Sequence, residues 1–295
     1  MGSSSAAVSA RFAYAEGIQN KALNLVLLKE AEALALLFDR AGIAAIFLKG
    51  IALLDEAYKN LAARSMSDID VLVHGDDLQR ACRAILETGF VMNPNALALH
   101  KQVGCFSVYV DLHPNLWFFS SEAFWQRSRL KNSPSSCMRV LSPEDQFLHC
   151  ILHSVAQDGE IKEQAIEDCK RILASNEFRW NIFTGTVIQE GWERPVGLFL
   201  EAFEDACPGI IPSPVLKNLS GFDKRSPASR VPYARILRLQ SKPWRRVGLL
   251  RDIVFPSSHF LKLRYSWIPR PLAFFLPVCR PFLLLTSWLA CRFSR

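Results

Sequence analysis

The strongest constraint on the fold is an alternation of helical and strand-like segments between Asn20 and Leu116. An Ala- and Leu-rich stretch with helical spacing runs from Asn20 to Ala41 and ends at Gly42, a residue typical of helix C-termini. Short runs rich in β-branched and aromatic residues follow, separated by helical segments: IAAIFLKG, DIDVLVHG and CFSVYVDLHPNL. Helices that alternate with strands in this way indicate an α/β fold.

The second part of the chain has helical periodicity. LSPEDQFLHCILHSVAQ opens with a Ser-Pro-Glu-Asp helix start, and IKEQAIEDCKRILAS continues in helical register. We therefore expect four regions: a flexible leader at residues 1–19, an α/β core at 20–130, a helical domain at 131–212, and a basic, apolar C-terminal region at 213–295 that packs on the core or on a partner.

The charge is divided unevenly along the chain. The formal net charge is +7, but residues 213–295 hold 16 Lys and Arg against 2 acidic residues, and residues 1–212 hold 19 against 26. The C-terminal region is therefore a candidate surface for an anionic partner or a membrane, and it also contains the apolar residues 272–291. Arg280 between two prolines argues against a membrane span, because a central charge costs at least ~2.5 kcal/mol. Packing into the core, peripheral membrane contact and membrane insertion are the alternatives, in that order.

The cysteines and the N-terminus favour a cytoplasmic protein. The 8 cysteines are scattered without a CxxC pair, which favours reduced thiols over a disulfide framework or a zinc site. The first residues, MGSSSAAVSARFAYAEG, lack the basic and apolar segments of a secretory signal. We expect a cytoplasmic location, with attachment to the inner face of the membrane as an alternative.

Three carboxylates fall at strand positions. Asp68 and Asp70 begin one strand, and Asp111 lies near the end of another. Residues two apart in a strand project from the same face, so Asp68 and Asp70 can share a cation, and an adjacent strand can bring Asp111 beside them. Oxygen ligands suit Mg²⁺. Asp-x-Asp is also common in solvated turns, but a carboxylate pair in an apolar strand is costly without a counter-cation.

Cationic residues lie upstream of this pair. Lys49 and Gly50 sit at a strand-to-helix turn, where backbone N–H groups and a lysine can meet a phosphate, and the Arg64 guanidinium suits bidentate phosphate contact. Taken singly, Lys49 and Arg64 are as compatible with ordinary surface charges.

These motifs together resemble an uncharacterised bacterial nucleotidyltransferase family of the DNA polymerase beta-like superfamily. The resemblance rests on an ordered series: Leu48-Lys49-Gly50, Arg64, Asp68-Ile69-Asp70, Gly89-Phe90 and Asp111-Leu112-His113. LSPEDQFLHCILH resembles the family's helical segment, and FPSSHFLKLRY at residues 255–265 resembles its C-terminal element. The chain departs from the superfamily at Lys49-Gly50, where Gly-Ser is usual, and at Pro114, where an aromatic residue is expected after His113.

The resemblance implies a small mixed-sheet nucleotidyltransferase core followed by a helical domain. It implies an enzyme that moves a nucleoside monophosphate from an NTP, such as ATP, to an acceptor hydroxyl or phosphate on a small molecule or peptide. The implied metal is Mg²⁺, with Mn²⁺ as an alternative. Asp68, Asp70 and Asp111 are the implied metal ligands and catalytic residues, and Lys49, Gly50, Arg64 and Ser67 are the expected nucleotide-binding residues.

Other functions are compatible with the same residues. One alternative is a non-catalytic module that keeps the fold and binds a nucleotide or a partner, at a membrane surface or in solution. A nucleic-acid binder would depend only on the basic C-terminal region, and we do not expect one.

Overall fold

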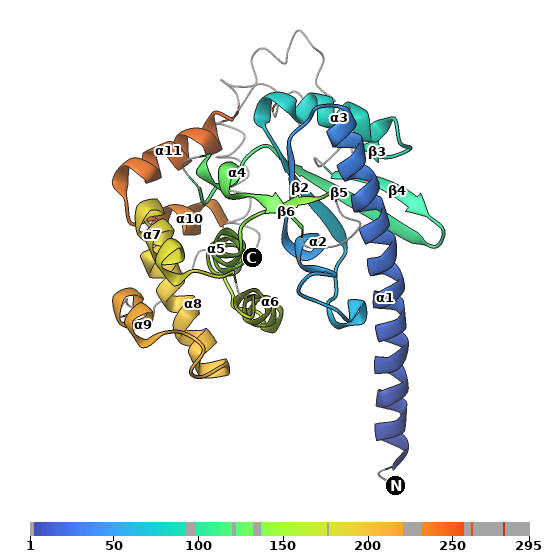
Figure 1. The fold of residues 1–295 in the computed structure, drawn as a ribbon, viewed down its shortest axis with the longest axis horizontal. Coiled ribbons are helices and arrows are strands. Elements are labelled where there is room, and N and C mark those ends of the chain that lie inside the picture. Colours follow the sequence, from blue (N-terminus) through green and yellow to red (C-terminus); the bar gives the residue numbers. More distant parts are fainter. Residues whose placement is uncertain are drawn as a thin grey trace. The chain divides into compact units, whose positions relative to one another are not determined.

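The chain forms two compact units in the computed structural model (Figure 1). The structure describes residues 3–92, 98–119, 122–131, 137–175, 177–220 and 232–256, together with Leu261 and Arg280. The first unit comprises Met1–Asn115 and Ser128–Leu141, and the second comprises Leu116–Arg127 and Ser142–Arg295.

A mixed sheet forms the centre of the first unit. Within the described residues it has seven strands in the order β3-β4-β5-β2-β1-β7-β6. The strands are β1 (Ala45–Phe47), β2 (Asp68–Val73), β3 (Val91–Met92), β4 (Ala98–Val103), β5 (Phe106–His113), β6 (Arg129–Leu130) and β7 (Arg139–Val140). β2 pairs parallel with β5 and antiparallel with β1. The predicted α/β fold with a small mixed sheet is confirmed.

One face of the central strands is apolar and is covered by helices. β5 alternates buried residues (Val108, Val110, Leu112) with more exposed ones, as expected for a strand with one covered face. Helices α1 (Ser3–Arg40) and α3 (Leu78–Leu86) contact β5. The buried residues of α1 recur at helical spacing: Leu27, Ala31, Leu34, Ala35 and Phe38. The other face of β5 is left for the polar residues of the site.

The remaining short elements of the first unit connect these strands. They are α2 (Lys49–Leu53), η1 (Leu61–Ala63) and η2 (Gly75–Asp77). α2 follows β1 directly, and η1 precedes β2, so both flank the start of β2 where the predicted carboxylates lie.

Two predicted boundaries differ from the structure. Helix α1 begins at Ser3, so residues 3–19, predicted as a flexible leader, are helical. The predicted end of the core at residue 130 falls inside the β6–β7 pair, and β7 pairs with β1 through Phe47 and Val140. Because of that pairing, the first unit extends to Leu141, while residues 116–127 belong to the second unit.

The second unit is helical in its described residues. Its helices are α4 (Ala123–Arg127), α5 (Pro143–Leu152), α6 (Glu163–Leu173), α7 (Trp180–Glu190), α8 (Glu193–Ala206), α9 (Ser213–Leu219), α10 (Pro232–Leu239) and α11 (Pro243–Val254), with the π-helical turn η3 (His153–Asp158) after α5. Ser142 caps α5, as the Ser-Pro-Glu-Asp pattern predicts, because its side chain accepts a hydrogen bond from the Asp145 backbone. Large side chains fill the core: Phe147, Phe183, Trp192, Phe199 and Phe203.

The predicted C-terminal region is described only in part. Residues 213–220 and 232–256 belong to the same unit as α5–α8, so the structure draws no boundary at residue 212. Most of residues 257–295, including the apolar stretch and most of the FPSSHFLKLRY element, lie outside the described residues. Among the helices that are described, none combines the length and the apolar character needed to cross a membrane.

Candidate functional site

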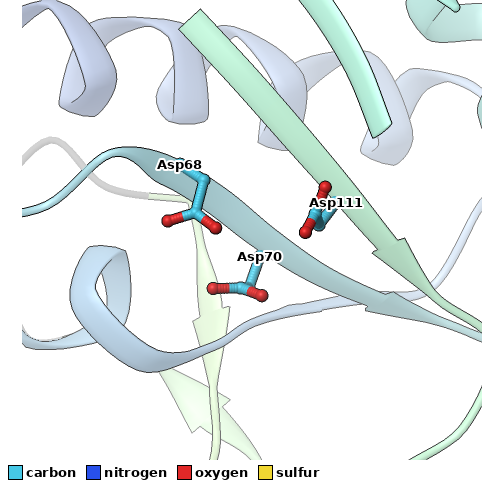
Figure 2. Close-up of side chains that lie close together, drawn as sticks. All are labelled: Asp68, Asp70 and Asp111. Atoms are coloured by element: carbon cyan, nitrogen blue, oxygen red, sulfur yellow. The ribbon is translucent and has the colours of Figure 1, made fainter. Parts of the chain in front are cut away.

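Three aspartates from two adjacent strands converge on one face of the sheet. Asp68 and Asp70 lie two apart on β2, and the parallel pairing places Asp70 opposite Asp111 on β5. One carboxylate oxygen of each lies within 4.8 Å of the others. Figure 2 shows the three carboxylates pointing toward one another. We call Asp68, Asp70 and Asp111 the aspartate cluster. The sequence prediction that a neighbouring strand brings Asp111 beside the Asp-x-Asp pair is confirmed.

Lys49 reaches the cluster from the turn after β1. Because β1 and β2 are antiparallel, the end of β1 lies beside the start of β2, and the Leu48 N–H donates to the Asp70 carbonyl at 3.0 Å. Lys49 then turns with a φ of 50°, in the left-handed region, which costs a residue with a Cβ about 1 kcal/mol or more. Its Nζ donates to Asp70 Oδ1 at 2.7 Å. The strained turn thus aims the ammonium at the buried carboxylate.

His113 is a second hydrogen-bond donor to the same oxygen. It follows Asp111 by two residues on β5 and so projects from the same face. Its Nε2 donates to Asp70 Oδ1 at 2.8 Å. The sequence analysis gave His113 no role, and Pro114 follows it where the resembling family has an aromatic residue. The spacing from Asp111 was the signal that could have identified it.

The buried carboxylate of Asp70 and the half-buried carboxylate of Asp111 differ in acidity. Burial raises the pKa of Asp70, but the hydrogen bond from His113 and the charge of Lys49 outweigh it, so this pKa lies well below its usual range. Burial and the negative charge of Asp70 raise the pKa of Asp111. Among the described residues the Asp111 carboxylate makes no hydrogen bond or ion pair. The cluster therefore holds more negative charge than Lys49 neutralises.

Gly50 and Arg64 fit against each other beside this turn. A Cβ on Gly50 would lie 2.2 Å from Arg64 Nη1 and 2.4 Å from Met66 Sδ, so only glycine permits this approach. Arg64 is buried, with 9% of its surface exposed. The structure therefore brings together Gly50 and Arg64, two of the predicted nucleotide-binding residues. The close packing of Arg64 accounts for a glycine at position 50.

Asn24 holds the loop that carries Arg64, and the sequence analysis missed it. From α1, its fully buried Nδ2 donates to the carbonyls of Leu61 and Arg64, both at 2.7 Å. A single asparagine in a helix has no sequence signal for such a role. Ser67, the last predicted nucleotide-binding residue, is exposed, and its Oγ donates to Asp68 Oδ1 at 3.1 Å.

The donor set suits a hard divalent cation. The cluster offers only oxygen atoms, which Mg²⁺ and Mn²⁺ prefer. Burial and the negative charge of Asp70 raise the pKa of Asp111, and a bound cation would favour its ionised form. Asp68, Asp70 and Asp111 therefore fit a metal ion, while Lys49 and His113 both hydrogen-bond to Oδ1 of one of these ligands, Asp70.

The comparisons with known proteins agree with this chemistry. Residues 3–205 match the sequence model of a protein family described as "Uncharacterised nucleotidyltransferase". The match spans the sheet unit and helices α4–α7 with nearly all of α8, and it stops before residues 213–295. No curated protein matches the chain.

Proposed function

The chain belongs to this uncharacterised nucleotidyltransferase family, and we propose that it is a Mg²⁺-dependent enzyme that transfers a nucleoside monophosphate from an NTP to an acceptor hydroxyl or phosphate. The observation that carries the proposal is the aspartate cluster, with three carboxylate oxygens within 4.8 Å of one another on paired strands. The family match supports nucleotidyl transfer as the general reaction. The DNA polymerase beta-like superfamily and a bacterial origin stay predictions.

The proposed reaction is an in-line displacement at the α-phosphorus. The acceptor oxygen forms a bond to the α-phosphorus, the bond to the bridging oxygen of the β-phosphate breaks, and pyrophosphate leaves. The aspartate cluster would hold the Mg²⁺ ion, which when bound would polarise the α-phosphate and activate the acceptor. The proton of an acceptor hydroxyl passes to Asp111, the role that the family resemblance implies for the third carboxylate.

The surrounding residues orient the reactants. Lys49, fixed at its turn, and Arg64, packed against Gly50, supply cations for the NTP phosphates, and the exposed Ser67 is placed to contact the same ligand. His113 donates a hydrogen bond to Asp70 Oδ1, and this bond fixes the orientation of the Asp70 carboxylate. His113 is thus a positioning residue in the proposed site.

Transfer from α-labelled NTPs tests the proposal. The purified protein is incubated with each of the four NTPs, Mg²⁺ and a metabolite and peptide extract, and modified acceptors are sought by mass spectrometry. We expect transfer and pyrophosphate release by the wild type and by Asp39→Ala, an exposed aspartate on α1. We expect none from Asp70→Ala. Circular dichroism checks that the variants are folded.

A binding experiment separates the alternatives. Calorimetry with Mg²⁺ and Mn²⁺ should show binding to the wild type that Asp70→Ala loses. NTP binding without transfer to any acceptor would assign the chain to the non-catalytic alternative. Equal transfer by Asp70→Ala and wild type would overturn the aspartate cluster as the metal site.

A further inference from the structure

Helix α11 presents large apolar side chains outward. Its buried residues Arg245, Leu249 and Ile253 are spaced by four and define the inward face. Trp244, Val247 and Leu250, spaced by three, are 66%, 68% and 50% exposed, and Phe255 just beyond the helix is 56% exposed. Scattered apolar residues are normal on a surface, but a stripe on one helix face indicates an interaction site. We call Trp244, Val247, Leu250 and Phe255 the α11 stripe (α11 is orange in Figure 1).

Basic residues flank the α11 stripe. Lys242, Arg246 and Arg251 lie on or next to the helix, against a single acidic residue, Asp252. Arg246 is exposed and the Arg251 side chain is 73% exposed, while the Lys242 ammonium lies 5.3 Å from the centre of the Trp244 ring. The whole of residues 213–295 has the same bias, with 16 Lys and Arg against 2 acids. The partner of this face must therefore be anionic and also receive apolar side chains.

The inward face of α11 is fixed by polar contacts. Arg245 pairs with Glu190 on α7 at 2.8 Å, with 9% and 3% of the two side chains exposed. Arg245 Nη2 also donates to the Phe118 carbonyl at 3.3 Å, and Arg280 Nε donates to the Ile253 carbonyl at 3.1 Å. Rotating the helix to bury its stripe would leave a buried guanidinium and a buried carboxylate unpaired, and unpaired buried charges are strongly destabilising. The α11 stripe is therefore held outward.

We propose that the α11 stripe binds the surface of an anionic phospholipid membrane. Apolar side chains enter the boundary between headgroups and acyl chains, a tryptophan sits at headgroup depth, and basic residues contact anionic headgroups. A helix of 12 residues is too short to span the bilayer, so it lies along the surface. Nucleic acid would bind the arginines through its phosphates but would offer no apolar site for Val247 and Leu250. This proposal does not depend on the proposed enzymatic function.

Vesicle co-sedimentation of the full chain tests the proposal. The vesicles are phosphatidylcholine alone, or phosphatidylcholine with about one-third phosphatidylserine. We expect binding to the anionic vesicles that falls with added salt and is weak on neutral ones. The double substitution Val247→Ser and Leu250→Ser should weaken it at least about tenfold, as should Arg246→Glu.

Matched variants make the result specific. Ile188→Ser changes a 53% exposed apolar residue on α7, and Lys170→Glu reverses an exposed charge on α6 of the same unit. Both should bind like the wild type. Binding that the serine variant keeps and only Arg246→Glu loses would overturn the proposal in favour of a purely electrostatic partner. No binding to anionic vesicles would also overturn it.

A spectroscopic measurement covers the case in which the double variant misfolds. Brominated acyl chains quench the emission of tryptophans that reach the boundary of the hydrocarbon. The wild type should be quenched on anionic vesicles, and Trp244→Phe, which keeps an aromatic ring, should bind but lose that quenching. Equal quenching in wild type and Trp244→Phe would place the contact elsewhere and overturn the assignment to the α11 stripe.

Discussion

Both units of the chain bury carboxylates, but they neutralise them in different ways. In the second unit three buried acids each pair with an arginine: Arg127 holds Asp145 through two hydrogen bonds of 2.8 Å, Arg245 pairs with Glu190 at 2.8 Å, and Arg179 with Glu144 at 3.2 Å. In the first unit, Lys49 and His113 both donate to one oxygen of Asp70, and the Asp111 carboxylate accepts no hydrogen bond from the described residues.

This difference distinguishes buried ion pairs that stabilise the fold from the carboxylates of the aspartate cluster, which we propose bind a metal ion. One cation per carboxylate, with good geometry, satisfies a buried acid. Three neighbouring carboxylates whose two hydrogen-bond donors, Lys49 and His113, meet on one oxygen leave repulsion in the folded protein, and such a cost persists at sites kept for function. The comparison predicts that replacing an acid by its amide has opposite effects on stability in the two units.

Asp111→Asn should produce the largest change, in activity. Losing a ligand of the proposed metal should lower transfer by about 10³-fold or more. Without metal, the same change removes repulsion with Asp70 and should raise the free energy of unfolding by about 0.5–1 kcal/mol at neutral pH. Transfer assays and urea unfolding of wild type, Asp111→Asn and the exposed control Asp39→Asn measure both effects.

The pH dependence of the free energy of unfolding is a second test of Asp111→Asn. Because the pKa of Asp111 is raised in the folded protein, the folded state binds more protons than the unfolded state above the ordinary value of 3.8. This group therefore makes the wild type lose stability as pH rises through that window, and Asp111→Asn should lack that contribution. A lower unfolding free energy for Asp111→Asn than for wild type at neutral pH would contradict the repulsion argument.

Asp145→Asn should have the opposite effect on stability. The asparagine side chain loses the charge that Arg127 meets and cannot accept both guanidinium hydrogen bonds, so the free energy of unfolding should fall by about 2–4 kcal/mol. Transfer per folded molecule should be unchanged. Asp252→Asn is the matched control, since its pair with Arg251 is exposed and should change stability by less than about 1 kcal/mol. Equal unfolding curves for Asp145→Asn and wild type would remove the distinction between the two units.

The central strands and the aspartate cluster could be predicted from sequence because their signals are local. Polar residues at alternate positions of apolar strands identified Asp68, Asp70 and Asp111. The two-residue strands β3, β6 and β7 were missed, since a pair of residues carries no period of two, and β4 (ALHKQV) buries only Leu99. The pairing of Phe47 with Val140, which moved the end of the sheet unit to Leu141, depends on residues far apart in the chain.

The partners of the site residues were harder to predict. Lys49 and Arg64 were expected to meet phosphate, and the structure adds that Lys49 also neutralises Asp70 and that Arg64 packs where a Gly50 side chain would be. His113 and Asn24 act through hydrogen bonds to segments 43 and 40 residues away. Contacts between residues so far apart in the chain cannot be predicted from the local sequence around either residue.

Lys131 is an intermediate case, a buried cation that has no carboxylate in hydrogen-bond contact within the described part of the chain. It is 3% exposed, and its Nζ donates to the Ile51 carbonyl at 3.2 Å. Burial lowers the pKa of Lys131 to about 8 from an ordinary 10.5, so between these values the folded state binds fewer protons than the unfolded state. Stability should therefore rise with pH across this window and be lowest below it.

Lys131→Met tests that case. Removing the buried charge should raise the free energy of unfolding by on the order of 1–3 kcal/mol near neutral pH and abolish this part of the pH dependence. Urea unfolding of wild type and variant between pH 8 and 10.5 gives the free energy of unfolding and its pH dependence. Lys170→Met, which changes an exposed lysine on α6, is the control. A destabilised variant would mean that the bond to the Ile51 carbonyl outweighs the cost of burying the charge.

Asn24→Leu should show the smallest effect, because it changes a neutral group that touches no reacting atom. Leucine keeps the volume on α1 but leaves the carbonyls of Leu61 and Arg64 without their 2.7 Å donor. Unfolding should cost about 1–2 kcal/mol less, and the loop that carries Arg64 should lose its fixed position. Because Arg64 is proposed to bind phosphate, KM for the NTP should rise several-fold with kcat nearly unchanged. Asn24→Ser, which keeps a donor, should recover part of the loss, whereas an unchanged KM would leave Asn24 a purely structural residue.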